Sequence, residues 1–148
     1  MMDYKPSILV DNSEQVPWIF PGYKVFRTNL RDVGSDYSLR KYSKLIGVER
    51  KSFMDFVMRI SSDNIQSFMR NKIAKLLKLK FSCIIIEGHP EQSRKYSSII
   101  KIKPEQIISV SAHIMSFGLP VLFAGDRQLA NYACLRFLLE SKKRVDEI

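Results

Sequence analysis

The spacing of apolar positions divides the chain into a first part with strand-like periods and a second part with helical ones. Between residues 11 and 22, two prolines and a glycine disfavour regular structure, so a long loop is expected there. Short apolar or alternating segments on either side of this loop predict strands at residues 7–10, 23–30, 36–42 and 45–51. The last three follow one another closely, and this succession indicates an antiparallel meander.

Beyond residue 52 the apolar positions recur at helical spacing. They predict one helix at residues 53–60 and a second at residues 65–77, separated by the good helix-capping residues 61–63. The later segments predict, in order, a buried strand at 81–88, an exposed loop at 89–103, a helix that starts at Pro104, a strand at 119–123, a helix capped by Asp126 and a charged, fraying tail at 140–148.

These elements predict an α/β fold in which residues 1–148 form a single domain. Buried strands that are joined by helices tend to pair in parallel, and such strands would extend the meander. The expected architecture is a mixed β-sheet, an antiparallel meander plus parallel strands, flanked by helices on both faces. Sites in sheets of this kind gather at the strand ends.

The composition agrees with one globular domain and favours a negatively charged partner. A chain of 148 residues with 45% apolar residues can bury a substantial core. Lysine and arginine number 24 against 15 acidic residues, which gives a net charge of +9. This balance favours a polyanion such as nucleic acid, and a solvated basic surface is the alternative.

The cysteines and the apolar runs bear on the cellular compartment. Cys83 and Cys134 lack metal-ligand spacing and are expected to be buried hydrophobes in a reducing compartment. No apolar run approaches the roughly 20 residues that cross a bilayer, and residues 1–10 lack a cleavable signal pattern. The protein is therefore expected to be soluble and intracellular, without a membrane partner: cytoplasmic in a bacterium or phage, nuclear in a eukaryote.

The segment "GVERKSFMDF" places several charged residues where a predicted strand gives way to a helix. Side chains alternate along a strand, so Glu49 and Lys51 are expected on one face and Arg50 on the other. Asp55 falls in the first helical turn, and Asp36 near the neighbouring strand supplies a second acid. Two carboxylates and a lysine are the groups needed to hydrolyse a phosphodiester with Mg²⁺. The alternative is an exposed, salt-bridged corner of the surface.

Four motifs in a fixed order carry a resemblance to a known family. The segments "ILVDNSEQ", "VGSDYSL", "GVERKSFMDF" and "CIIIEG" resemble the nuclease domain of the XPF-type structure-specific endonucleases, a branch of the PD-(D/E)xK or restriction-endonuclease-like superfamily. The resemblance extends from about residue 7 to residue 139. The family signature is Gly-Asp followed by Glu-Arg-Lys-x-x-x-Asp, with an upstream Asp-x-Arg-Glu element. The positions that match the signature imply a catalytic set of Asp36, Glu49, Arg50, Lys51 and Asp55. Asp11 and Glu14 match the upstream element and are implied to border the same cleft.

The resemblance also implies the fold, the cofactor and the partners. It implies a restriction-endonuclease-like sheet in a metal-dependent endonuclease of the DNA repair or recombination type. The metal would be Mg²⁺ or Mn²⁺, bound by Asp36, Glu49 and Asp11. The substrate would be branched DNA with a duplex to single-strand junction.

Assembly and the alternative functions also follow from the family. Many relatives continue into a tandem helix-hairpin-helix module, which is not present in this sequence. A homodimer through the last two helices, or a partner protein, is therefore expected to supply additional DNA affinity. The alternatives on the same fold are a non-catalytic DNA-binding or dimerisation subunit and a phage-type junction resolvase.

Two positions depart from the family pattern. Ser13 stands where the upstream element has arginine, which removes a cation from that side of the cleft. Ser35 stands between Gly34 and Asp36, where the family has Gly-Asp directly, so it is either an insertion or a replacement of the glycine, and a slight displacement of Asp36 is expected.

Further basic and aromatic residues are candidates for DNA contact. Trp18 and Phe20 either stack on an unpaired base or pack beneath the first loop. The basic candidates for phosphate contact belong to the hairpin that follows Asp36 and to the polar face of the second helix: Arg40, Lys41, Lys44, Arg70, Lys75 and Lys78.

Overall fold

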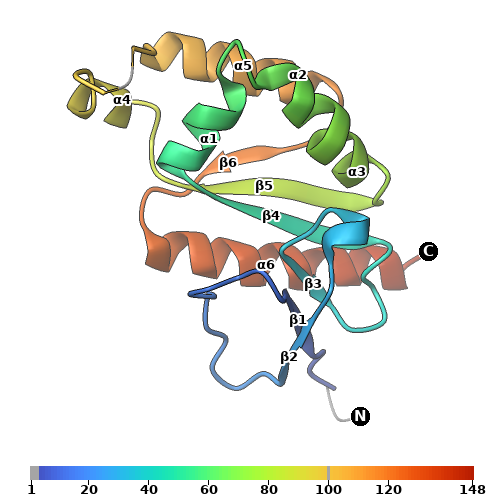
Figure 1. Ribbon diagram of the computed structural model, residues 1–148. Helices are drawn as coiled ribbons and strands as arrows, with labels where there is room; N and C mark the ends of the chain where they lie inside the picture. Colours follow the sequence, from blue (N-terminus) through green and yellow to red (C-terminus); the bar gives the residue numbers. More distant parts are fainter. Residues whose placement is uncertain (1–3, 100) are drawn as a thin grey trace.

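A mixed six-stranded β-sheet forms the centre of the computed structural model, which describes residues 4–99 and 101–148 (Figure 1). Residues 1–3, the start of the segment without a signal pattern, and residue 100, in the predicted loop 89–103, lie outside the described residues. The strand order is β2-β1-β3-β4-β5-β6. The strands are β1 Ile8–Asp11, β2 Val25–Thr28, β3 Tyr37–Leu39, β4 Ile46–Ser52, β5 Phe81–Glu87 and β6 Val121–Phe123.

The pairing confirms the mixed sheet but corrects the place of the second strand. β1 pairs antiparallel with β3, and β3 with β4, whereas β4, β5 and β6 pair in parallel. β2 is not part of the meander, because it pairs in parallel with β1 on the far side from β3. Burial explains this order. Ile8 and Val10 are almost completely buried, as interior strand residues are, whereas Val25 and Phe26 are 44% and 42% exposed, as befits an edge strand.

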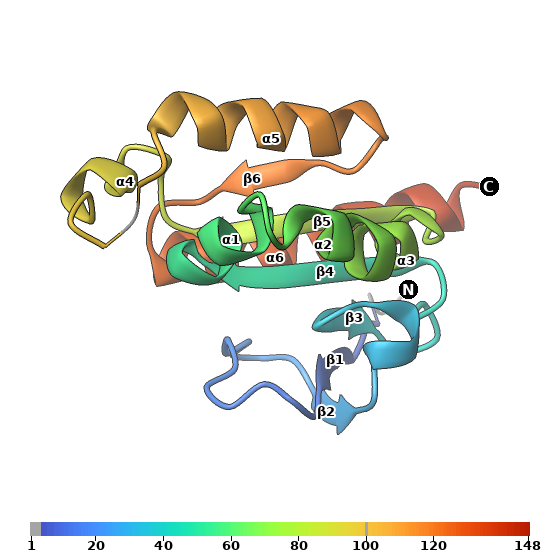
Figure 2. The same ribbon diagram turned by 45° about the horizontal axis from the view of Figure 1, so that its top comes forward.

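Helices cover both faces of the sheet and create two apolar cores (Figure 2). One face carries α1 and α5 together with the consecutive segments α2, η2 and α3, and the opposite face carries α6. The bounds are α1 Phe53–Ile60, α2 Ile65–Phe68, η2 Met69–Ile73, α3 Ala74–Leu77, α4 Gln92–Lys95, α5 Pro104–Ser116 and α6 Arg127–Asp146, with a short 3-10 turn, η1, at Arg31–Val33. Strand side chains alternate between the cores: Ile84 and Ile86 of β5 enter the first, Cys83 and Ile85 the second.

The helix ends agree with the capping signals, apart from two corrections. The Asp126 side chain accepts a hydrogen bond from the Leu129 backbone at 2.7 Å, which fixes the start of α6. The predicted tail at 140–148 is wrong, because α6 continues to Asp146, where ion pairs along the helix such as Lys142–Asp146 at 2.6 Å support its last turns. The predicted loop 89–103 contains the short helix α4.

The cysteines and the helices also bear on the compartment predictions. Cys83 and Cys134 are free and buried, which confirms that they act as small core residues. Burial raises the pKa of both thiols. Among residues 4–99 and 101–148, none of the helices combines the length and apolar character of a membrane span.

Candidate active site

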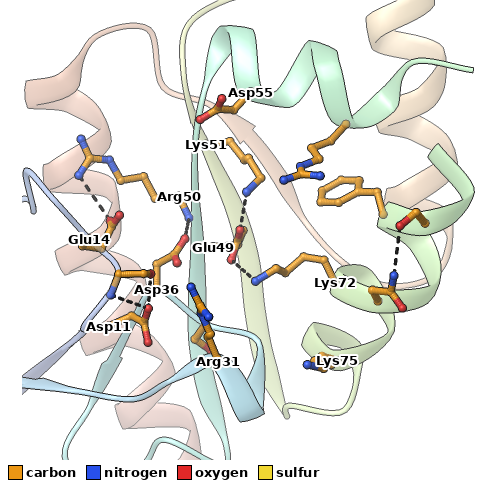
Figure 3. A pocket seen from close by; sticks show the side chains of 16 residues that line it. Asp11, Glu14, Arg31, Asp36, Glu49, Arg50, Lys51, Asp55, Lys72 and Lys75 are labelled. Atoms are coloured by element: carbon orange, nitrogen blue, oxygen red, sulfur yellow. Dashed lines mark hydrogen bonds and ion pairs between the residues drawn. The ribbon is translucent and has the colours of Figure 1, made fainter. Parts of the chain in front are cut away.

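A pocket of about 510 Å³ opens where β4 ends beside α1 and the α2–α3 segment (Figure 3). It gathers residues from the first loop, the β3–β4 hairpin and the two helices. Of the residues predicted from the sequence, eight line it: Asp11, Glu14, Asp36, Glu49, Arg50, Lys51, Asp55 and Lys75. The pocket therefore unites the whole signature set in one place.

Backbone hydrogen bonds hold Asp36 in the sheet. Its N–H donates to the Val48 carbonyl at 2.8 Å, and its carbonyl accepts from the Asp11 N–H at 2.8 Å. Asp36 is therefore fixed through its own backbone between Asp11 of β1 and Val48 of β4, and these two hydrogen bonds do not involve Ser35. The side chain of Ser35 lies instead against Gly47, where a Cβ would be 1.9 Å from the Ser35 Oγ. The close approach of the segment before β3 to β4 consequently requires glycine at position 47.

The electrostatics of Asp36 favour a cation nearby. Its Oδ2 accepts a hydrogen bond from the Arg50 backbone N–H at 2.8 Å. Burial and the negative charge of Glu49 nevertheless raise the pKa of Asp36 from 3.8 to about 8. Two carboxylates that disfavour each other's ionisation lower their free energy when a positive ion lies between them.

Glu49 is almost completely buried, with 1% of its surface exposed, yet it meets two lysines. Its Oε1 accepts from the Lys51 ammonium at 2.6 Å, and its Oε2 lies 3.3 Å from the Lys72 ammonium. The contact with Lys51 agrees with the strand alternation, which places both side chains on the α1 face of β4. Oε2 is buried beside Lys72 and has no hydrogen-bond partner among the described residues, so it is an unsatisfied acceptor for a ligand that displaces this lysine.

Arg50 points to the opposite face of β4 and binds protein groups. Its Nε donates to Glu87 Oε1 at 2.7 Å, its Nη1 donates to the Val16 carbonyl at 2.8 Å, and its guanidinium lies 4.6 Å from the Trp18 ring centroid. Glu14 is 3.5 Å from the same Nη1. Arg50 therefore ties the first loop to the sheet, and it reaches the Asp36 carboxylate through its backbone N–H.

The first loop is packed against this arginine and against α6. Trp18 is 2% exposed, stacks on Tyr37 with centroids 4.8 Å apart, and donates its indole N–H to Glu87 at 2.7 Å. Phe20 is also buried. Neither ring can stack on an unpaired base, so the packing alternative is the correct one. On the other side of the loop, the Val16 carbonyl also accepts from Arg127 of α6 at 3.1 Å.

Both carboxylate oxygens of Asp11 accept hydrogen bonds from protein groups. Oδ1 accepts from the Leu30 N–H at 2.7 Å, and Oδ2 accepts from the N–H of Ser13 at 3.0 Å and from its hydroxyl. Burial alone would raise the pKa of Asp11, but these hydrogen bonds hold it below its usual value. Ser13 thus has a definite function, which is to orient this acid.

The donor set fits a divalent cation with two protein carboxylates. In the part of the chain that the structure describes, no three His, Cys, Asp or Glu side chains converge as a metal-binding group. Asp36, Glu49 and Asp11 line one pocket, but both oxygens of Asp11 already accept hydrogen bonds from Leu30 and Ser13. Mg²⁺ is commonly bound by one or two carboxylates with water and substrate phosphate in its other positions. The pocket therefore fits Mg²⁺ or Mn²⁺ through Asp36 and Glu49.

The predicted DNA-contact residues separate into two groups. Lys75 lines the pocket, whereas Arg70 belongs to a different groove beside His113 and Phe117. Arg40 lies over the Phe26 ring at 5.1 Å, at the end of β3 remote from Asp36. The structure does not bring the remaining members of the two sets to the pocket: Lys41, Lys44 and Lys78.

Several pocket residues were not found by sequence reasoning. The most central is Lys72, which lies in the π-helical segment η2 between α2 and α3. Lys72 stands three residues before Lys75, so even a regular helix places the two lysines on neighbouring positions of one side, and this spacing could have found it. The other additions are Arg31, Ser35, Arg59, Ser67, Phe68 and Asn71.

Comparison with known proteins agrees with the geometry. The sequence model of the ERCC4 domain family matches residues 11–134. Among solved structures, XPF from Aeropyrum pernix is similar with a TM-score of 0.71 and 20% identity over 96% of this chain and 68% of that one. XPF from Aeropyrum pernix in complex with DNA is similar with a TM-score of 0.68 and 20% identity over 95% of this chain and 66% of that one. A search of curated proteins gives no match.

Proposed function

The chain belongs to the ERCC4 domain family, and we propose that it is a metal-dependent endonuclease that hydrolyses phosphodiester bonds in branched DNA. One observation carries this proposal: Asp36, Glu49 and Lys51 line a single pocket at the end of β4. A subunit without catalytic activity would have no need for this combination of two acids and a lysine.

Asp36 and Glu49 would hold the Mg²⁺ or Mn²⁺ ion. When bound, such an ion neutralises the charge that develops on the phosphate and lowers the pKa of a coordinated water. Two features support these ligands. The pKa of Asp36 is raised by burial and by the Glu49 charge, and the Oε2 of Glu49 has no hydrogen-bond partner among the described residues. Both features would be relieved by a cation.

The other signature residues have separable roles. Lys51 presents its ammonium 2.6 Å from Glu49 and can donate a hydrogen bond to the attacking water or to the phosphate. Arg50 holds the first loop and, through its backbone, Asp36. Asp55 is exposed in the first turn of α1 and faces the same pocket, where it would order solvent or a second cation.

Basic residues around the pocket would hold the DNA backbone. Arg31, Arg59, Lys72 and Lys75 line it and supply positive charge around the acids. The net charge of +9 favours the approach of a polyanion. The preference for branched DNA rests on the family, and a second copy of the chain or a partner protein would extend the contact along the duplex.

Cleavage of labelled DNA tests the proposal. Fork, flap, four-way-junction and plain duplex substrates are incubated with the protein and Mg²⁺ or Mn²⁺, and then with a chelator. We expect cutting near the branch that stops in the chelator. Glu49→Gln and Lys51→Met should each reduce the rate by on the order of 10²-fold or more while DNA binding persists. Glu105→Gln, the same acid-to-amide change on exposed α5, serves as the control.

A wild-type chain that cuts none of the branched substrates with either metal would contradict the proposal. The same holds if the pocket variants cut as fast as the wild type. Either result would favour a non-catalytic DNA-binding subunit.

A further inference from the structure

Lys72 connects the helical side of the pocket to the segments that carry Glu49 and Asp36. It belongs to η2, and its ammonium lies 3.3 Å from the Oε2 of Glu49 and 3.4 Å from the Gly34 carbonyl (Figure 3). Gly34 is two residues before Asp36. The Lys72 side chain therefore contacts both Glu49 in β4 and the loop that leads to Asp36. No family motif of the sequence includes this residue.

The contact between Lys72 and Glu49 is the weaker of the two ion pairs at this acid. Lys51 is 2.6 Å from Oε1 with a side chain that is 14% exposed, whereas Lys72 is 3.3 Å from Oε2 and 30% exposed. Oε2 has no hydrogen-bond partner among the described residues, so Lys72 neutralises the charge of this oxygen without donating a hydrogen bond to it. A lysine head on a flexible four-carbon stem can leave such a contact at low cost.

A metal held by Glu49 would neutralise the same carboxylate that Lys72 now neutralises. Two cations cannot share one carboxylate oxygen in a small pocket without repulsion. A metal bound through Asp36 and Glu49 would therefore compete with Lys72, and the released ammonium would remain beside the pocket that admits the phosphate.

Building on the proposed function, we propose that Lys72 is a placeholder cation, which neutralises Glu49 in the metal-free protein and would bind the scissile phosphate when Asp36 and Glu49 hold a metal. Lys72 thus opposes metal binding and assists cleavage. A residue needed merely for the fold would affect both properties in the same direction.

Metal affinity and cleavage are measured on separate readouts. Calorimetric titration with Mn²⁺ in the absence of DNA gives the affinity, and single-turnover cleavage of a flap substrate at saturating Mn²⁺ gives the rate. We expect Lys72→Met to bind Mn²⁺ about fivefold more tightly, which corresponds to roughly 1 kcal/mol. The same variant should cleave on the order of tenfold to a hundredfold more slowly, because the phosphate loses a cation.

Two further variants control for charge and for position. Lys72→Arg keeps the positive charge, so it should not bind Mn²⁺ more tightly than the wild type and should retain more cleavage than Lys72→Met. Lys75 lines the same pocket but forms no ion pair with Glu49. Lys75→Met should therefore leave the Mn²⁺ affinity unchanged. If Lys72→Met does not fold, as judged by its thermal unfolding, Lys72→Gln, which keeps a polar head, carries the same test.

The outcomes separate the two proposals. A wild-type chain that cleaves, beside a Lys72 variant with unchanged or weaker Mn²⁺ affinity, overturns the inference alone. Unchanged cleavage in that variant also overturns it. A wild-type chain that neither binds Mn²⁺ nor cleaves refutes the proposed function and this inference together.

Discussion

Replacing Asp36 by Asn should stabilise the metal-free protein at neutral and alkaline pH while abolishing cleavage. The pKa of Asp36 is raised from 3.8 to about 8, first by burial and then by the charge of Glu49. The folded protein therefore keeps a proton on Asp36 that the unfolded chain has already lost. The stability contributed by this proton is complete below about pH 4 and disappears as the pH rises to about 8.

The size of the effect follows from the two pKa values. Each pKa unit corresponds to about 1.4 kcal/mol, so the change from 3.8 to about 8 sets an upper limit of roughly 4 kcal/mol for the loss between pH 4 and pH 7. Asp36 is half-buried, and solvent screening reduces this figure. We expect the Asn variant, which has no proton to lose, to gain about 1 to 2 kcal/mol relative to the wild type at pH 8 and nothing near pH 4.

Urea unfolding in a chelating buffer at several pH values measures this difference. The Asn carbonyl can still accept the hydrogen bond from the Arg50 backbone, so the contact seen at 2.8 Å is retained. Addition of Mg²⁺ at pH 8 should stabilise the wild type but not the variant, because the ion neutralises the charge that the variant lacks. The reasoning is refuted if the two proteins show the same pH dependence, or if the variant is less stable at pH 8.

Four further outcomes can be checked directly. Lys75→Ala should reduce the salt dependence of DNA binding by about 0.9 in the logarithmic slope, whereas Arg40→Ala, remote from the pocket, should leave it unchanged in titrations at several salt concentrations. Trp18→Ala should cost about 3 to 5 kcal/mol of unfolding free energy in urea. Gly47→Ala should cost about 1 to 3 kcal/mol by the same measurement and also slow cleavage, because the new Cβ would push Ser35, the neighbour of Asp36. Light scattering at micromolar concentrations should give the mass of two chains, and the mass of one chain would contradict the expected homodimer.

The strand that carries the site could be predicted because its signal is local. Alternation along β4 places Glu49 and Lys51 on one face from the sequence alone, and the ion pair of 2.6 Å agrees with it. The period change at residue 52 likewise gives the start of α1. These features depend on neighbouring residues, so no knowledge of the distant chain is needed.

The features that could not be predicted depend on distant parts of the chain. The sequence predicts β2 as a strand but does not give its partner. β1 lies in the interior of the sheet because its side chains are buried, and β2 pairs with it at the edge. Lys72 approaches Glu49 from the helical segment η2, which follows β4 and α1 in the chain, so their contact depends on how that segment packs against the sheet. Arg50 belongs to the family signature, yet its guanidinium donates hydrogen bonds to Glu87 of β5 and to Val16 of the first loop. Both partners are far from Arg50 in the sequence, so these contacts could not be predicted from neighbouring residues.

The carbonyl of Val16 is shared by two arginines from different parts of the molecule. Arg50 of the active strand donates to it at 2.8 Å, and Arg127, in the first turn of α6, donates at 3.1 Å. Asn131, one turn further along α6, exchanges two hydrogen bonds with the backbone of Ile19 at 2.9 and 3.0 Å. Because one peptide group accepts from both arginines, a substitution that moves the first loop would weaken its contacts with β4 and with α6 together.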